Sequence, residues 1–170
     1  ELEITADDGS EFDERWAGEI EKIAGVKAAV PLVQQPLAPY VAGKRIELSM
    51  LGIDPQKDIA VREFKVVEGK FFEDGSDADN LENGEDESED DGEVDRGVVV
   101  DSGFARNLGL KIGDKVSMMS EAGPYRTTIV GLLEAQGTAA ANEMAVMFLP
   151  LAKAQELFTG EGYVTKLQLV

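Results

Sequence analysis

Residues 97–116 read GVVVDSGFARNLGLKIGDKV, and this stretch predicts a strand, a helix and a second strand in immediate succession. The three valines at 98–100 form a short apolar run, which is typical of a strand that is buried on both faces. A helix is expected over Ser102–Leu108, because Gly109 follows the last apolar position and favours a helix end. The next strand is expected at Val116–Ser120. Short strands and helices in this order indicate an α+β fold with mixed sheets and a few short helices.

The remainder of the C-terminal half continues this pattern with one further helix. Glu121–Pro124 has the composition of a hairpin turn, so the strand before it should return along Tyr125–Leu133. Pro150 suits the first turn of a helix, because its ring fixes a helical φ and its missing amide proton is not needed there. We therefore expect a strand over Ala145–Leu149, a helix over Leu151–Phe158 and a last strand over Tyr163–Val170.

The N-terminal part begins with a short alternating strand, Leu2–Thr5, and then predicts an amphipathic helix over about residues 11–24. Ser10 can cap this helix and Gly25 can end it. The apolar residues of the helix recur at helical spacing, so they should form one buried stripe. The stripe consists of Phe12, Trp16, Ile20, Ile23 and Ala24.

Between residues 26 and 70 the pattern changes to short apolar runs, which predict the strands of a meander with a turn at Ala42–Lys44. The middle run, Leu37–Val41, lies in a proline-rich part of the chain, with prolines at 31, 36 and 39. Proline cannot donate a ladder hydrogen bond, so this middle run should lie at a sheet edge or cross between sheets. We expect two subdomains. One would hold the first helix and the strands of both chain ends, which would lie near each other, and the other would hold the middle strands.

The segment 73–95 holds 13 of the 34 acidic residues and no basic residue, so the net charge of −18 is largely a local property. Without this segment the chain has a net charge of −5, the difference between −18 and −13. The only clear aliphatic residue before Val94 is Leu81, which leaves too little apolar area to offset the entropy of ordering. We expect a disordered insertion in a domain that spans residues 1–170.

The chain contains no cysteine and no histidine. This excludes disulfides, zinc sites of the usual ligand type, thiol nucleophiles and the commonest general base, and we assign no catalytic residue, cofactor or metal. The sequence has no lysine and arginine cluster that could neutralise a run of phosphates, so no nucleic acid partner is expected. No apolar run of about 18 residues and no signal peptide is present, and we interpret the chain as a piece of a longer protein.

The acidic segment contains a pattern that resembles the start of a calcium-binding loop. Glu87, Glu89 and Asp91 alternate before Gly92, as the first ligands of such a loop would. The position that should supply the closing bidentate glutamate is Val98. We therefore favour a solvated charge run over a specific calcium site, with weak and diffuse binding of divalent ions left open.

Ser102 lies between a predicted strand and a predicted helix, where a nucleophile elbow would place its serine. Val100 and Phe104 occupy the positions at which the G-x-S-x-G motif requires glycine, and no histidine is present to activate the hydroxyl. We favour a structural role in which Asp101 or Ser102 caps the helix.

Two further groups of side chains have a binding alternative. Phe12 and Trp16 could form a platform for a sugar, but their register with Ile20 and Ile23 favours the buried stripe. Four methionines lie on or beside predicted strands, where they are expected to fill the core or line a groove rather than bind a metal. They are Met118, Met119, Met144 and Met147.

The order of several motifs resembles the MacB-like periplasmic core domain of FtsX-type ABC transporter permeases. In the C-terminal half the motifs are the stretch 97–116, Thr128–Leu133 and Val146–Phe158. Ile23–Pro31, Leu51–Pro55 and Val67–Phe72 fit the same family more loosely. The motifs cover nearly the whole chain apart from the acidic segment, which departs from the family pattern.

The resemblance implies an extracytoplasmic domain, between the first and second transmembrane helices of a permease, on the periplasmic side of the inner membrane. It implies no catalytic site, because ATP hydrolysis would take place in a separate cytoplasmic subunit or domain. The domain would couple ATP-driven transmembrane motion to substrate export, lipoprotein release or regulation of a partner. Its partners would be the ATPase, the transmembrane helices of the same permease and a periplasmic or envelope protein, with a homodimer as one option for the full transporter.

A different class of protein stays open on the residues alone, namely a free-standing extracellular hydrolase that uses a carboxylate pair. Any two of the many acidic residues could face each other across a cleft. The parent gene separates the two hypotheses, because flanking hydrophobic segments favour the permease, whereas a signal peptide and a stop codon favour the hydrolase.

Overall fold

The structure is a computed structural model that describes residues 2–58, 64–72, 97–135 and 145–170. Its strands are β1 (Leu2–Ile4), β2 (Phe12–Asp13), β3 (Ala29–Leu37), β4 (Tyr40–Val41), β5 (Lys44–Arg45), β6 (Leu48–Ile53), β7 (Phe64–Gly69), β8 (Val98–Asp101), β9 (Lys115–Ser120), β10 (Gly123–Ala135), β11 (Val146–Pro150), β12 (Tyr163–Val164) and β13 (Lys166–Leu169). Its helices are α1 (Trp16–Ile20), α2 (Pro55–Asp58), α3 (Ser102–Leu108) and α4 (Leu151–Ala154), and α4 continues into the π-helical turn η3 (Gln155–Thr159).

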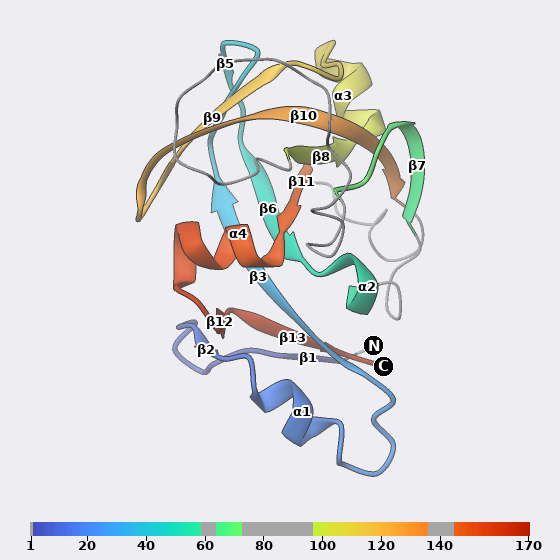
Figure 1. The fold of residues 1–170 in the computed structure, drawn as a ribbon, viewed down its shortest axis with the longest axis vertical. Coiled ribbons are helices and arrows are strands. Elements are labelled where there is room, and N and C mark those ends of the chain that lie inside the picture. Colours follow the sequence, from blue (N-terminus) through green and yellow to red (C-terminus); the bar gives the residue numbers. More distant parts are fainter. Residues whose placement is uncertain (1, 59–63, 73–96, 136–144) are drawn as a thin grey trace, which may run out of the picture.

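Most strands belong to one curved, mixed sheet, which confirms the expected α+β architecture (Figure 1). Along the sheet the order is β1, β13, β3, β6, β11, β8, β10, β9, β4 and β5, and β7 pairs with β10 outside this path. The pairs β8–β10 and β6–β11 are parallel. β2 and β12 form a separate pair. The sheet therefore runs without interruption from the strands of the chain ends to the β4–β5 hairpin at the opposite pole.

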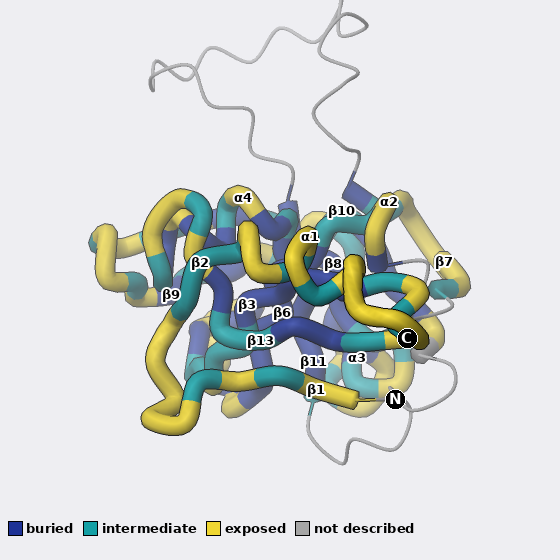
Figure 2. The backbone as a smooth tube through the Cα atoms, turned by 90° about the horizontal axis from the view of Figure 1, so that it is seen from below, coloured by how far each residue is buried: buried dark blue, intermediate teal, exposed yellow. Residues whose placement is uncertain are grey.

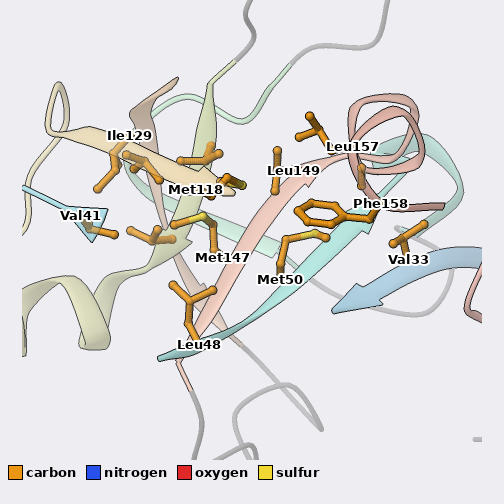
Figure 3. Close-up of a cluster of buried hydrophobic side chains, with 14 of the residues drawn as sticks. Val33, Val41, Leu48, Met50, Met118, Ile129, Met147, Leu149, Leu157 and Phe158 are labelled. Carbon is orange, nitrogen blue, oxygen red and sulfur yellow. The ribbon is translucent and has the colours of Figure 1, made fainter. Parts of the chain in front are cut away.

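The central strands are buried on both faces, as the valine run at 98–100 predicts. Alternate residues contribute to two separate apolar clusters, because successive side chains of a strand point to opposite faces. Met50, Met147 and Leu149 belong to the larger cluster, which α3, α4 and η3 cover (Figure 3). Val99 and Phe148 belong to the smaller cluster on the other face. Burying each such side chain contributes about 1.5–3 kcal/mol, so these strands form the stable centre of the molecule.

The close contact between α4 and β6 depends on a glycine. A Cβ atom at Gly52 would lie 2.2 Å from Ala154 Cβ and 3.4 Å from Val33 Cβ. The absence of a side chain at Gly52 therefore lets the helix lie directly on the strand.

The helix expected over about residues 11–24 is wrong over most of its length. The structure has α1 only over Trp16–Ile20, and Arg15 at its N-cap position makes no side-chain cap hydrogen bond. Ser10 does not cap a helix, because its backbone N and Oγ both donate to Asp8 Oδ1, at 3.0 and 2.6 Å. Phe12–Asp13 instead pairs as a strand with β12. Tertiary pairing therefore overrides the local helical spacing.

The predicted buried stripe is correct at two of its five positions and wrong at the other three. Phe12 and Ile20 are partly buried and pack against the larger cluster. Trp16 and Ile23 are each 58% exposed, and Ala24 is exposed as well. Because α1 has only five residues, it cannot present the full stripe to the core.

Several other elements agree with the sequence expectations, with two corrections. The last strand expected over Tyr163–Val170 is divided into β12 and β13, which belong to different sheets. The strands expected as a meander are not paired in chain order, because β3 pairs with β6 and β4 pairs with β9. α3 covers the predicted residues, and Gly109 ends it with a left-handed φ of 67°. The turn at Ala42–Lys44 joins β4 to β5, with positive φ angles at Ala42 (49°) and Gly43 (78°). The acidic segment 73–95 lies outside the described residues, so the expectation of disorder stays a prediction. Among the described helices, none has the length and apolar character needed to cross a membrane.

Candidate functional site

The two ends of the described chain lie side by side in one sheet (Figures 1 and 2). β1 and β13 are antiparallel, and Leu2 stands opposite Leu169. On its other side β13 pairs with β3, and this pairing continues to the last residue, because Val170 N donates to Ala28 O at 3.0 Å and Val170 O accepts from Lys27 N at 2.6 Å. The prediction that the terminal strands lie near each other is therefore confirmed.

An ion pair crosses the two terminal strands. Lys166 Nζ donates to Glu3 Oε2 at 2.8 Å, and the two side chains are 19% and 49% exposed. A surface pair of this kind contributes only about 0.2–1 kcal/mol. The fully buried Leu167, which stands opposite Ile4, contributes more to fixing the register.

β3 connects the chain ends to the central sheet, because its two halves pair with different neighbours. Residues 29–32 pair with β13, and residues 33–37 pair with β6 on the other side of the strand. Pro31 and Pro36 fall one in each half. Each half of β3 pairs with a neighbouring strand on one side only. A proline is tolerated where its nitrogen faces the other, unpaired side, because no amide proton is needed there. This agrees with the expectation that the proline-containing run lies at an edge or crosses between sheets.

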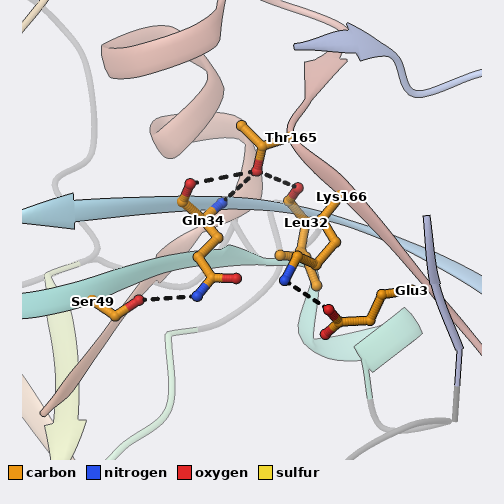
Figure 4. A network of polar contacts seen from close by, with 6 residues as sticks. All are labelled: Glu3, Leu32, Gln34, Ser49, Thr165 and Lys166. Atoms are coloured by element: carbon orange, nitrogen blue, oxygen red, sulfur yellow. Dashed lines mark hydrogen bonds and ion pairs between the residues drawn. The ribbon is translucent and has the colours of Figure 1, made fainter. Parts of the chain in front are cut away.

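Thr165 lies at the point where β13 leaves β3. Its backbone N donates to Leu32 O at 3.2 Å, and its Oγ1 accepts from the backbone N of Gln34 at 2.7 Å. The hydroxyl can itself donate to the carbonyl oxygen of Leu32 or of Gln34, each 3.5 Å away (Figure 4). One side chain therefore supplies the acceptor that a ladder carbonyl would supply in a longer strand.

The side chain of Gln34 extends this polar network toward the central strands. Gln34 Nε2 donates to Ser49 Oγ on β6 at 3.3 Å (Figure 4). Ser49 is 7% exposed, and its backbone N donates to Ala145 O, just before β11, at 2.8 Å. Hydrogen bonds thus follow a continuous route from β13 through β3 and β6 to the start of β11.

A second connection joins the α1 side of the chain-end region to η3. Gln155 Nε2 donates to Glu14 Oε2 at 2.8 Å, and Glu14 N donates to Gly162 O at 2.9 Å. Gln155 is 7% exposed, so water competes little for its hydrogen bond. Two separate connections resist rotation of the chain-end strands against the central sheet better than one would.

An apolar groove of about 230 Å³ lies between α1 and β1. It is lined by Ile4, Thr5, Ala6, Phe12, Trp16, Ile20 and Leu167. Phe12 and Trp16 therefore do lie together, as the sugar-platform alternative requires. Thr5 is the one polar side chain in the lining, whereas sites for polar ligands bring several polar groups together.

Local hydrogen bonds perturb two carboxyl groups of the N-terminal segment. The side chain of Arg15 lowers the pKa of Asp13, and hydrogen bonds from Ser10 lower the pKa of Asp8. The same pairing raises the pKa of Arg15. A carboxyl group with a lowered pKa is ionised near neutral pH, so neither aspartate suits the general acid of the carboxylate-pair hydrolase.

The residues proposed as helix caps separate clearly in the structure. Asp101 Oδ1 accepts from Phe104 N at 2.8 Å, whereas Ser102 is the first residue of α3. The capping prediction is therefore confirmed for Asp101 and wrong for Ser102. An aspartate at this position also complements the positive end of the helix.

The methionines and the calcium pattern have mixed outcomes. Met118 and Met147 are buried, at 5% and 0% exposure, which confirms a core role, whereas Met119 is 72% exposed. Met144 and the acidic residues of the calcium pattern lie outside the described residues, and the closing position, Val98, is buried in β8. Where the chain is described, no three His, Cys, Asp or Glu residues are grouped as metal ligands.

One feature of the surface is not visible in the sequence, because its basic residues are not close together along the chain. Arg45, Lys115 and Arg126 come from three different strands, and the register of β4, β5, β9 and β10 brings them to one face. Alternation along each strand would have placed them on the exposed side, but only the strand pairing shows that they are neighbours.

Comparisons with known proteins give a consistent result. The family model of the MacB-like periplasmic core domain matches residues 3–169. The chain is similar in structure to the extracellular domain of the noncanonic ABC-type transporter YknZ from Gram-positive bacteria, with a TM-score of 0.62, 15% identity and coverage of 99% of this chain and 80% of that chain. It is also similar to the periplasmic region of MacB from Actinobacillus actinomycetemcomitans, with a TM-score of 0.58, 16% identity and coverage of 98% and 65%. No curated protein sequence matches the chain.

Proposed function

The chain belongs to the family of MacB-like periplasmic core domains, the extracytoplasmic domains of ABC transporter permeases, and from this premise we propose that it transmits motion of the transmembrane helices to a partner outside the cytoplasm. In this proposal the chain does no chemistry, and a separate ATPase subunit or domain supplies the energy. The output is substrate export, lipoprotein release or regulation of an envelope protein, depending on the partner. The full transporter would hold two such domains facing each other.

One observation carries the proposal: both chain ends belong to the sheet that continues to the opposite pole of the molecule. A displacement applied at the ends therefore reaches the β4–β5 hairpin through paired strands instead of through a flexible linker. A flexible linker would change its own end-to-end distance and would not pass the displacement on. The fully buried core residues on both faces of the central strands keep the intervening sheet stiff.

The direction of the force decides how well the sheet resists it. Leu2 and Leu169 are opposite each other at the same end of an antiparallel pair, so pulling them apart breaks the hydrogen bonds one after another. A pull between Val170 and the turn at Ala42 runs along β13 and β3, so it loads the β13–β3 hydrogen bonds together. The fold should therefore be weak against separation of its ends and strong against a pull between its poles.

Single-molecule force spectroscopy on the 170-residue chain tests this expectation. The chain lacks cysteine, so two introduced cysteines would be the only attachment points for thiol-reactive handles. We expect a clearly higher unfolding force with handles at Ala42→Cys and Val170→Cys than with handles at Leu2→Cys and Val170→Cys. Equal forces, or the reverse order, would show that the strands of the chain ends are not a stiff connection.

The full permease provides the functional test. A Leu2→Cys/Leu169→Cys disulfide should leave transport by the permease intact, because the proposal needs the two ends to move as one body. A flexible Gly-Ser insertion directly after Val170 should abolish transport while ATP hydrolysis continues. The single cysteine variants and a reducing agent serve as controls. Loss of transport on oxidation of the double variant, or full transport with the insertion, would contradict the proposal.

A further inference from the structure

The pole farthest from the chain ends carries an unusual set of side chains on the outer surface of the β5–β4–β9–β10 sheet. We define this distal face by Tyr40, Arg45, Lys115, Ser117, Met119 and Arg126. Figure 1 shows β5, β9 and β10 at the opposite end of the molecule from the labelled termini, and β4 pairs with both β5 and β9. Nothing in the proposed coupling function requires these side chains.

The strand register makes the distal face one continuous patch. Tyr40 on β4 stands opposite both Arg45 on β5 and Ser117 on β9, and Ser117 stands opposite Arg126 on β10. Residues opposite each other across strands have Cβ atoms about 4.5–5.5 Å apart and point to the same side of the sheet. Lys115 and Met119 lie two residues to either side of Ser117, so they share its face.

The three cations of the distal face stand out in a chain whose net charge is −18, or −5 without residues 73–95. All three side chains are exposed, and in the part of the chain that is described none of them forms an ion pair. By contrast, Lys22 and Lys166, near the chain ends, each pair with a glutamate. Three unpaired cations side by side repel one another, and a partner with negative charge would relieve that repulsion.

The neutral residues of the distal face indicate which kind of anion fits. Tyr40 is 55% exposed and Met119 is 72% exposed, so the patch combines large apolar side chains with arginine. Tyr, Met and Arg are the residue types that are enriched at the centres of protein interfaces. A site for a small free anion would not need the exposed apolar side chains. The combination fits an acidic protein surface with apolar side chains among its carboxylates.

The distal face is also shaped and supported for docking. Lys115, Ser117, Arg126 and Thr128 contribute to the lining of a hollow of about 480 Å³, and the two hydroxyl groups can hydrogen-bond to carboxylates or backbone. Val41, Val116 and Ile129 are fully buried beneath the same strands. A face that rests on packed side chains loses little conformational entropy on binding.

We propose that the distal face docks an acidic segment of a partner protein. Arg45, Lys115 and Arg126 contact its carboxylates, and Tyr40 and Met119 cover its apolar side chains. Anionic lipid fits less well, because recognition of a lipid surface by charge generally uses about four to eight clustered basic residues, and the chain as a whole is acidic. This inference is independent of the coupling function, since the face could bind a partner whether or not the sheet transmits force.

Binding of defined probes to the 170-residue chain tests the proposal. The probe is a fluorescein-labelled peptide that alternates Glu with Leu or Phe, and its counterpart has Lys in place of Glu. The third probe is a vesicle of phosphatidylglycerol. We expect the acidic peptide to bind with an affinity that falls as salt is raised, and the vesicles to bind at least tenfold more weakly. The acidic segment of the chain attracts the Lys peptide, so binding of that peptide should not depend on the residues of the distal face.

Two variants locate the binding. Arg45→Glu/Arg126→Glu should weaken binding of the acidic peptide at least tenfold, and Tyr40→Ala should weaken it severalfold. Lys22→Glu/Lys27→Glu changes the net charge by the same amount at the opposite end of the molecule and should change the affinity less than twofold. Thermal melting checks that each variant remains folded.

Three outcomes would overturn the proposal. The first is no binding of the acidic peptide at low salt. The second is an equal loss of affinity in the distal and the control charge variants, which would show only a general charge effect. The third is preferential binding of vesicles that depends on Arg45 and Arg126, which would assign the face to lipid.

Discussion

Thr165 is the residue at which the chain-end strands depend on a single hydroxyl group. Its Oγ1 accepts from Gln34 N at 2.7 Å, where β13 can no longer supply a carbonyl. A valine at this position has the same shape but cannot accept a hydrogen bond. The hydroxyl is therefore a local test of how firmly β13 is held to β3.

We expect Thr165→Val to lower the free energy of unfolding by about 1–2 kcal/mol, because the amide of Gln34 loses its partner in a partly buried position. Urea denaturation of the 170-residue chain measures this change. Thr165→Ser keeps the hydroxyl and is the matched control, with an expected loss of less than half as much. A valine variant as stable as the serine variant would show that the hydrogen bond contributes little.

Gly52 makes a second prediction at the scale of one residue. Gly52→Ala should lower the free energy of unfolding by about 1–3 kcal/mol, because the new Cβ would lie 2.2 Å from Ala154 Cβ and force α4 away from β6. Differential scanning calorimetry measures the loss.

Gly18→Ala is the control for this substitution, because a Cβ at Gly18 in α1 meets no atom within 4 Å. It should be neutral or slightly stabilising, since alanine favours a helix more than glycine does. The double variant Gly52→Ala/Ala154→Gly should recover part of the lost stability. A Gly52→Ala variant as stable as the unmodified chain would contradict the close packing of the helix on the strand.

At the scale of elements, α3 has a defined start at Asp101. Asp101→Ala should destabilise the chain by about 1 kcal/mol, because Phe104 N loses its capping acceptor. Ser102→Ala should have a clearly smaller effect, since Ser102 is already inside the helix. Thermal unfolding followed by circular dichroism compares the two variants. Equal losses would show that the serine shares the capping role.

The contrast between α3 and α1 shows what the sequence can and cannot predict. Ser102–Leu108 was predictable because its start and stop residues lie next to a buried strand of unambiguous composition. The prediction of a helix over about residues 11–24 was wrong because Phe12–Asp13 pairs with β12, which lies far away in the sequence. Local spacing has no information about that distant partner.

The candidate sites divide in the same way. The neighbouring chain ends were predictable, because both terminal segments have the alternation of strands that a single sheet can join. Two features were not predictable: the hydrogen bond between Thr165 and Gln34, and the distal face. Both depend on the register between strands that are distant in sequence, and a shift of one residue would move every side chain to the other face.

At the scale of the whole molecule, the acidic segment should be separable from the fold. The composition of residues 74–93 offers very little apolar surface to bury. Deleting them should therefore change the thermal midpoint by less than about 3 °C, since closing a loop costs little more when the loop is long. Calorimetry of the shortened chain makes the comparison. A large loss of stability would show that the segment contributes to the core.

The opposition of Leu2 and Leu169 has a further consequence for the architecture of a longer polypeptide. Paired residues of an antiparallel ladder have Cα atoms about 4.5–5.5 Å apart, so the chain leaves the domain almost where it entered. If the domain is inserted into a longer polypeptide, the two flanking segments are therefore held about as close together as a short turn would hold them. Membrane segments could therefore acquire or lose this domain without rearranging their own packing.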